Sequence, residues 1–287
     1  MSEATIASPA QTQVRTHSEL VDEKLVRTYF ITALIFLTTS MLAGLLMAFQ
    51  LIRHNPLQGI ELFSPGRWRM VHTNAVAYGF LANGFLGCLH WVVPRLTLQP
   101  VLDKRLSWLI YAAWQIVVGA TAVGILLGEA QALEWGETPV WIDPVAQLGL
   151  LLVAINFMTP IARMKGPIYV TLWYFLAAFV WTFLTYAMGN FIPEYFVGGT
   201  SAGAVGGLFI HDLVGLFVTP LGWGLDVLLC ADPSEEAHLE SRTFAGWLLG
   251  AWHSSIRFRG STTSSTPLSR CSCSMVPWCQ RLQLSLS

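Results

Sequence analysis

The chain has 287 residues, of which 54% are hydrophobic and 11% charged, with a mean hydropathy of +0.54 and a formal net charge of -1. This composition is too apolar for a soluble domain with a hydrated surface, and the near-neutral charge gives no basic surface for nucleic acid. The first 24 residues are polar, with no apolar segment ending in a small-residue cleavage site, so we expect a cytoplasmic tail rather than a removed signal peptide.

Six long apolar runs follow this tail. A bilayer core of about 30 Å requires roughly 20 consecutive apolar residues in a helix. The sequence therefore predicts an all-α, polytopic transmembrane helix bundle of six spans, which lie near residues 29–52, 70–93, 106–127, 145–162, 168–188 and 203–225.

Charges in the loops predict one orientation. Basic residues on cytoplasmic loops outnumber those on external loops in membrane proteins, and the loop 128–143 contains four carboxylates without a lysine or arginine. We therefore expect a multi-pass protein of the bacterial inner membrane with a cytoplasmic N-terminus. The basic residues on the cytoplasmic side would be Arg15, Lys24, Arg27, Arg95, Lys104, Arg105, Arg163 and Lys165. Arg53, Arg67 and Arg69 fall on the outer side against this rule, so they require a partner there.

The membrane pattern stops after Leu225. Residues 226–287 are rich in Ser, Thr, Arg and Cys and have no sustained apolar period. We divide the chain into a polar tail at 1–24, a six-span domain at 25–225 and a second tail at 226–287. This second tail is either disordered or translated out of frame.

Two of the seven histidines, His72 and His211, lie inside predicted spans. Ionisable groups within a membrane are costly and indicate a functional site, although a single histidine also serves as a neutral hydrogen-bonding group between helices. His90 lies near a span end beside Trp91, where we expect a membrane-interface residue without a chemical role.

His72 has neighbours that favour heme ligation. On a helix it shares a face with small residues, at which a flat macrocycle could approach or another helix could pack: Ala75, Val76, Gly79, Ala82 and Asn83. Arg67 and Arg69, about one turn upstream, are suited to pair with heme propionates. The alternative is that both are interfacial arginines whose side chains reach toward the headgroups.

His211 lies between Gly207 and Gly215 on its own helix face, with Asp212 next to it. Neutral imidazole is a common transition-metal ligand, and a carboxylate often orients it. Asp212 points about 100° around the helix from His211, so it is equally suited to a proton path or a polar helix contact.

The segment Gly66-Arg67-Trp68-Arg69-Met70-Val71-His72-Thr73-Asn74-Ala75-Val76, with Phe85-Leu86-Gly87 and Trp91-Val92-Val93-Pro94, resembles the second span of the heme-copper oxidase catalytic subunit, in its cbb-type branch. The resemblance implies that His72 binds the iron of the low-spin heme b. The segment from Ile210 to Thr219 resembles the span whose histidine binds copper, which implies that role for His211. Asp212 and Gly206-Gly207 depart from the family pattern.

The resemblance, which covers about residues 25 to 225, implies an oxidoreductase of the cytochrome c oxidase type. Such an enzyme takes electrons from cytochrome c type subunits, reduces oxygen to water at a high-spin heme and copper, and translocates protons. The family's oxygen-site tyrosine, high-spin heme ligand and remaining histidines have no counterpart here, so we assign no catalytic residue and expect this chain, as it stands, to be inactive. Back-translation of residues 226–233 in one shifted frame, and of residues 253–264 in another, permits two family segments in the expected order, the second with the tyrosine and a histidine pair. This favours the out-of-frame interpretation of the tail.

Two alternatives remain at this stage. Nitric oxide reductase, of the same superfamily, places non-heme iron and a glutamate at the second metal, but no glutamate lies near His211 in the sixth span. A transporter or a non-catalytic heme anchor is compatible with Pro160 and Pro220 near span ends.

Overall fold

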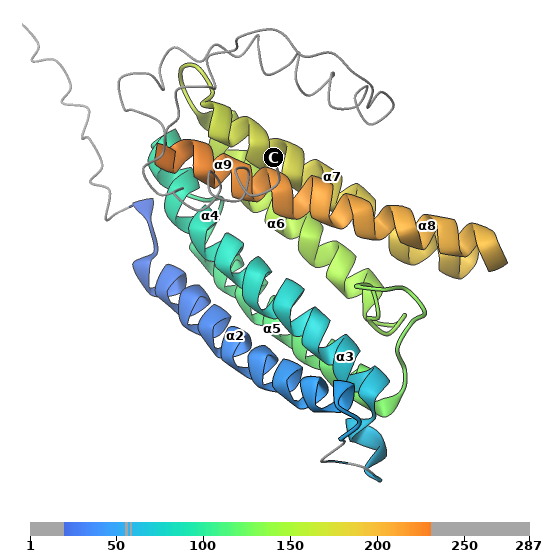
Figure 1. Ribbon diagram of the computed structural model, residues 1–287. Coiled ribbons are helices and arrows are strands. Elements are labelled where there is room, and N and C mark those ends of the chain that lie inside the picture. The colour runs from blue at the N-terminus through green and yellow to red at the C-terminus, as the bar shows by residue number, and fades with distance from the viewer. Residues whose placement is uncertain (1–19, 55–56, 58, 231–287) are drawn as a thin grey trace, which may run out of the picture. The chain divides into compact units, whose positions relative to one another are not determined.

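The computed structural model describes residues 20–54, 57 and 59–230, and its secondary structure is helical (Figure 1). Six helices are long and apolar enough to cross a membrane, which confirms the predicted all-α fold and the number of spans. They are Glu23–Gln50, Pro65–Thr97, Lys104–Leu127, Asp143–Arg163, Val170–Tyr195 and Gly199–Leu228. Nearly all of the predicted tails lie outside the described residues.

The helices begin and end at residues suited to those positions. The side chain of Asp22 accepts a hydrogen bond from the Leu25 N–H (3.1 Å), Asp103 accepts one from the Arg105 N–H (2.9 Å), and Gly128 ends a helix at φ 91°. In chain order the elements are α2 (Glu23–Leu51), η1 (Glu61–Phe63), α3 (Pro65–Asn74), η2 (Ala75–Leu81), α4 (Ala82–Thr97), α5 (Lys104–Leu127), α6 (Asp143–Arg163), α7 (Val170–Tyr195), α8 (Gly199–Asp212), η3 (Leu213–Val218) and α9 (Thr219–Cys230). Helix α9 thus continues five residues past the expected end at Leu225.

The second and sixth spans each contain a π-helical segment, η2 and η3, which begins within three residues after a histidine. A π turn bonds residue i to i+5, so it takes up an extra residue and leaves a backbone carbonyl without its usual partner. In η2 the Tyr78 carbonyl accepts from Trp114 Nε1 (3.1 Å), and in η3 the Val214 carbonyl accepts from Thr219 Oγ1 (2.9 Å). Such segments are frequent at functional sites.

The chain divides into two compact units. The first contains the described residues up to Lys165 together with Thr185–Ile210, and the second contains Gly166–Leu184 with the chain from His211 onward. His72 and both predicted propionate partners lie in the first unit, whereas His211 lies in the second.

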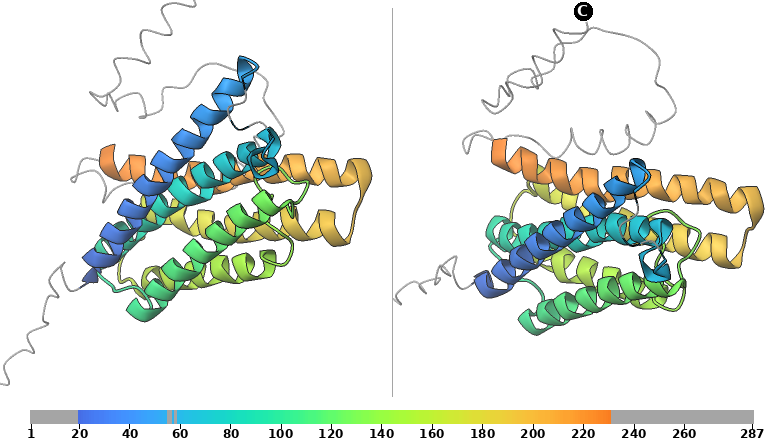
Figure 2. Two further views of the ribbon diagram at one scale, coloured as in Figure 1. Left: turned by 90° about the horizontal axis from the view of Figure 1, so that it is seen from below. Right: turned by 60° about the horizontal axis from the view of Figure 1, so that its bottom comes forward.

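In the first unit, α2 packs along α3, η2 and α4, and α5 packs against α3 and α6 (Figure 2). Two glycines allow α2 to approach closely. A Cβ on Gly79 would lie 2.5 Å from the Phe36 ring, and one on Gly87 would lie 3.2 Å from Tyr29. These contacts place η2 and α4, the later part of the second span, directly against α2.

Several polar side chains of this unit are buried between the helices, and many large apolar side chains face outward. Asn83 and Asn156 are 0% exposed, whereas Ile116 and Leu127 are 70% and 64% exposed. Asn156 Nδ2 donates to Ser107 Oγ (3.0 Å), and so joins α6 to α5. This distribution is that of a bundle whose surrounding solvent is lipid.

The expected interface position of His90 is wrong. His90 is buried, its Nδ1 donates to the Leu86 carbonyl (2.8 Å), and its ring stacks on Tyr29 with centroids 5.2 Å apart. Phe157 contacts the same imidazole edge-on. The neighbouring Trp91 is instead 37% exposed, because adjacent helical residues point about 100° apart.

The second unit joins part of α7 to η3 and α9. Leu172 and Phe175 of α7 are 0% exposed and Leu221 of α9 is 2% exposed. A Cβ on Gly224 would lie 2.8 Å from the Phe175 ring, so a glycine is needed where these two helices touch.

Candidate heme site

His72 lies on α3, one turn before the π segment, and its side chain is held by α2. Its Nδ1 lies 2.7 Å from the carbonyl oxygen of Ser40. A carbonyl only accepts hydrogen bonds, so Nδ1 carries the proton and Nε2 carries a lone pair. Metal-binding histidines commonly donate their second ring N–H to a backbone carbonyl in this way.

Gly44 creates the space for this imidazole. A Cβ at position 44 would lie 2.9 Å from His72 Cε1 and 3.2 Å from Nδ1. Ser40 and Gly44 are one helical turn apart, so they present a carbonyl and a bare backbone on one face of α2. Together they fix the tautomer and the orientation of the ring.

The second ring nitrogen of His72 has no hydrogen-bond partner among the described residues, and the side chain is only partly buried. An imidazole with a fixed tautomer and an unshared Nε2 lone pair is suited to bind iron as an axial ligand. The residues present therefore fit a heme.

The small residues that follow His72 do not share one face with it, contrary to what an ideal helix would predict. Ala75 and Val76 are partly exposed, but Gly79, Ala82 and Asn83 are buried. Gly79 lies against Phe36, and Asn83 Nδ2 donates to the Gly79 carbonyl (2.7 Å) while its Oδ1 accepts from Gln115 (2.7 Å). The π segment rotates the positions that follow it, so a spacing of 3.6 residues per turn does not extend from His72 to Asn83.

Arg67 and Arg69 lie near His72, each with a carboxylate partner. Arg67 donates to Glu61 (2.6 Å) and to the Leu126 carbonyl (2.8 Å) at the end of α5. Arg69 donates to Glu134 (3.0 Å), and both of these side chains are about half exposed. Two of the three arginines that the sequence placed on the unexpected side are thus paired, whereas the exposed Arg53 has no ion-pair partner among the described residues. Exposed ion pairs contribute about 0–1 kcal/mol, so Arg69 can exchange Glu134 for another carboxylate at little cost. Arg67 is 21% exposed, but its partner Glu61 is 82% exposed and can be exchanged while Arg67 keeps its bond to the Leu126 carbonyl.

Glu137 is a buried carboxylate that sequence reasoning used only to orient the chain. It is 2% exposed, and its Oε2 accepts from Asn74 Nδ2 (2.7 Å), two residues after His72. Burial raises the pKa of Glu137, and the hydrogen bond from Asn74 opposes that shift. Tyr78 donates to the Trp135 carbonyl, so the 128–142 loop is attached to the second span at two levels. Its three carboxylates, Glu129, Glu134 and Glu137, were the available sequence signal.

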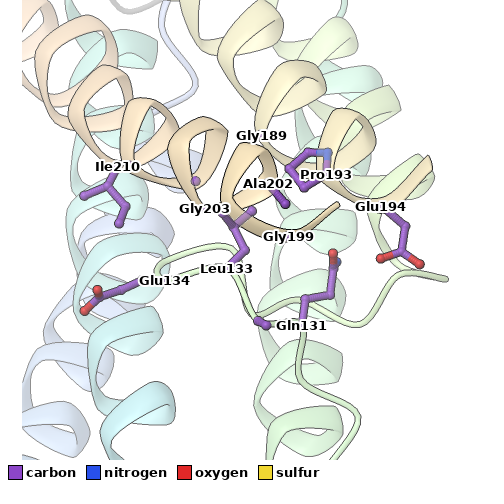
Figure 3. A pocket seen from close by; sticks show the side chains of 13 residues that line it. Gln131, Leu133, Glu134, Gly189, Pro193, Glu194, Gly199, Ala202, Gly203 and Ile210 are labelled. Atoms are coloured by element: carbon purple, nitrogen blue, oxygen red, sulfur yellow. The ribbon is translucent and has the colours of Figure 1, made fainter. Parts of the chain in front are cut away.

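A cavity of about 610 Å³ lies between this loop, the end of α7 and the start of α8. In Figure 3 the carboxylates of Glu134 and Glu194 lie on opposite sides of it, and Gly199, Ala202 and Gly203 of α8 form a surface of small residues. His72, Arg67 and Arg69 do not line this cavity, although Glu134, the partner of Arg69, does.

His211 lies in the last turn of α8 with an exposed side chain, and Asp212 beside it is partly buried. A Cβ on Gly207 or Gly215 would meet nothing within 4 Å. No group of three or more His, Cys, Asp or Glu residues suited to a metal ion occurs in the described part of the chain. The copper role of His211 therefore remains a prediction.

Residues 24–231 match the family model described as Cytochrome C and Quinol oxidase polypeptide I. The chain belongs to this family. Curated relatives include cytochrome c oxidase subunit 1 of Rhodobacter capsulatus, which is 27% identical over 191 residues that cover 62% of this chain and 36% of the relative. A cytochrome c oxidase subunit 1 homolog of Azorhizobium caulinodans is 28% identical over 195 residues, which cover 62% and 34%. The cbb3-type cytochrome c oxidase subunit CcoN1 of Stutzerimonas stutzeri is 27% identical over 207 residues, which cover 68% and 43%.

Family membership confirms the resemblance to heme-copper oxidase subunit I that the motifs around His72 and His211 indicate. It supports an integral membrane protein of an oxidoreductase family. The chain spans between 34% and 43% of the length of these three relatives.

Proposed function

We propose that this chain forms the low-spin heme b site of a terminal respiratory oxidase, with His72 as an axial ligand to the iron. The observation that carries the proposal is the hydrogen bond from His72 Nδ1 to the Ser40 carbonyl, with Gly44 clearing the space beside the ring. This arrangement presents Nε2 with its lone pair, which is the atom that binds iron.

The residues around the ligand have separate roles. Ser40 holds the proton on Nδ1, and Gly44 allows the ring to lie against α2. Arg67 and Arg69 supply positive charge near the same end of the span, where they would exchange Glu61 and Glu134 for the propionates. When bound, a heme would supply one-electron redox chemistry at this site.

For the whole protein, we propose oxidation of cytochrome c coupled to reduction of oxygen to water and proton translocation across the bacterial inner membrane. His211 would contribute one imidazole to the copper of the oxygen site, and cytochrome c type subunits would donate electrons. The names of the relatives, all cytochrome c oxidase subunits, support this proposal over nitric oxide reductase. The family match also weighs against a transporter.

An absorption spectrum tests the heme ligand. The full chain, purified in detergent and incubated with heme, should show a Soret band and the sharp reduced-state bands of a six-coordinate low-spin heme when a second strong-field ligand is supplied. His72→Ala should abolish the low-spin spectrum. His54→Ala changes an exposed histidine in the loop after α2, so it is the matched control and should leave the spectrum unchanged. An unchanged spectrum in the His72 variant would refute the proposal.

A further inference from the structure

The two ends of the first unit differ in how their positive charges are neutralised. At the end where α2 and α5 begin and α4 and α6 finish, the described residues include seven basic ones and three carboxylates. We call these seven the basic end: Lys24, Arg27, Arg95, Lys104, Arg105, Arg163 and Lys165. In Figure 2 the starts of α2 and α5 lie at the same end of the molecule as the finish of α4.

Two of the three carboxylates at the basic end, Asp22 and Asp103, cap helices, and the third, Glu23, is exposed in the first turn of α2. Asp22 accepts from the Leu25 N–H and from Trp108 Nε1 (3.0 Å), and Asp103 caps α5. None of the seven basic side chains has an ion-pair partner within the described residues. At the opposite end Arg67 and Arg69 are paired, and Arg53 is the one arginine there that has no ion-pair partner among the described residues. The basic end therefore has a surplus of positive charge that the described fold does not neutralise.

Arg95 is held in place within this surplus. Its guanidinium carbon lies 3.4 Å from the centroid of the Trp91 ring, one turn earlier on α4. Its Nε is buried without a hydrogen-bond partner among the described residues. Stacking on an aromatic ring orients the planar guanidinium and leaves its terminal N–H groups available for a bidentate acceptor such as a phosphate.

Apolar side chains adjoin these charges. Trp91 is 37% exposed, and the loop after α4 presents Leu98 at 63% and Leu102 at 37% exposed. Tryptophan gathers at the level of the lipid headgroups in membrane proteins. A ligand that meets both the apolar and the cationic groups is an amphiphile with an anionic headgroup, rather than free phosphate or an acidic soluble peptide.

We propose that the basic end binds the phosphate headgroups of anionic phospholipids, with Arg95, stacked on Trp91, as the anchoring contact. Lys104 and Arg105, both exposed in the first turn of α5, add further attraction. This inference depends on the membrane-spanning fold and not on the heme site, so either proposal can fail without the other.

Lipid binding to the full purified chain in detergent tests this proposal. Native mass spectrometry with phosphatidylglycerol and phosphatidylcholine at equal concentrations should show preferential binding of phosphatidylglycerol. Arg95→Gln should weaken that binding by about fivefold, as expected for one charge at an anionic lipid surface. Arg53→Gln, an exposed arginine outside the basic end, is the control and should bind as the unmodified chain does.

Two further variants distinguish the loss of a lipid contact from misfolding of the chain. The pair Lys104→Gln and Arg105→Gln changes only exposed side chains and should also reduce phosphatidylglycerol binding. Trp91→Leu should weaken binding while it keeps every charge. Equal binding of the two lipids, an equal loss in the Arg53 variant, or competition by inorganic phosphate at the same concentration would overturn the proposal.

Discussion

Gly44 and His72 lie in direct contact, with the bare backbone of α2 against the edge of the imidazole. A Cβ at position 44 would lie 2.9 Å from Cε1, well inside ordinary van der Waals distance. This contact is what lets Nδ1 reach the Ser40 carbonyl, so the geometry of the candidate ligand depends on a residue that has no side chain.

Gly44→Ala should therefore weaken heme binding. The added methyl group must displace the imidazole and lengthen its hydrogen bond to Ser40, and overpacking of this kind costs about 1–3 kcal/mol. Heme titration followed by absorbance should show roughly a tenfold or greater loss of affinity. Gly84→Ala, at a helical glycine whose Cβ would meet nothing within 4 Å, is the matched control and should bind heme normally.

Arg67→Gln should destabilise the chain more than Arg69→Gln. Arg67 is 21% exposed and bonds both Glu61 and the Leu126 carbonyl, whereas Arg69 is 51% exposed and bonds Glu134. Losing the partly buried contacts should cost about 1–2 kcal/mol, against about 0–1 kcal/mol for the exposed pair. Thermal unfolding in detergent measures the difference, and the opposite order would contradict these assignments.

The stability of the loop near Glu137 should depend on pH. Burial raises the pKa of Glu137 in the folded state, so the unfolded chain loses this proton at a lower pH than the folded chain does. The contribution of the neutral carboxyl to stability is then complete below the usual glutamate pKa and is lost as pH rises through the folded pKa. Asn74 Oδ1, buried without a partner among the described residues, is suited to accept from the protonated carboxyl.

Glu137→Gln should remove this dependence. The glutamine keeps an acceptor for Asn74 and cannot ionise, so the melting temperature of the variant should change less with pH. Above the pKa of Glu137 in the folded state, the variant should melt at a higher temperature than the unmodified chain. Melting curves across acid to neutral pH provide the measurement. A variant that is less stable at every pH would show that the ionised carboxylate is the favoured form.

Tyr29→Phe should leave stability unchanged or raise it. The Tyr29 ring is 0% exposed and stacks on His90, but its hydroxyl is buried without a partner among the described residues. An unsatisfied buried hydroxyl costs about 1–3 kcal/mol, whereas Tyr29→Ala should lose about 3–5 kcal/mol through the cavity that it creates. Thermal unfolding should separate the two variants. A large loss in the Phe variant would indicate that the hydroxyl has a water partner.

The number and approximate limits of the spans follow from the sequence alone, because the thickness of a bilayer sets the length of an apolar run whatever its neighbours are. His72 is identified for a similar reason, since an ionisable group inside such a run needs a function or a partner. Its tautomer could not be predicted, because Ser40 and Gly44 lie about 30 residues away on another helix.

Only the tertiary structure decides the partners of the other polar groups. Arg67 and Arg69 pair with Glu61 and Glu134 through loops whose course has no periodic signal. His90 is buried although it lies beside an exposed tryptophan, and the π segment after His72 rotates the face that an ideal helix would present. Local sequence determines which residues need a partner, but packing between helices determines which partner each one meets.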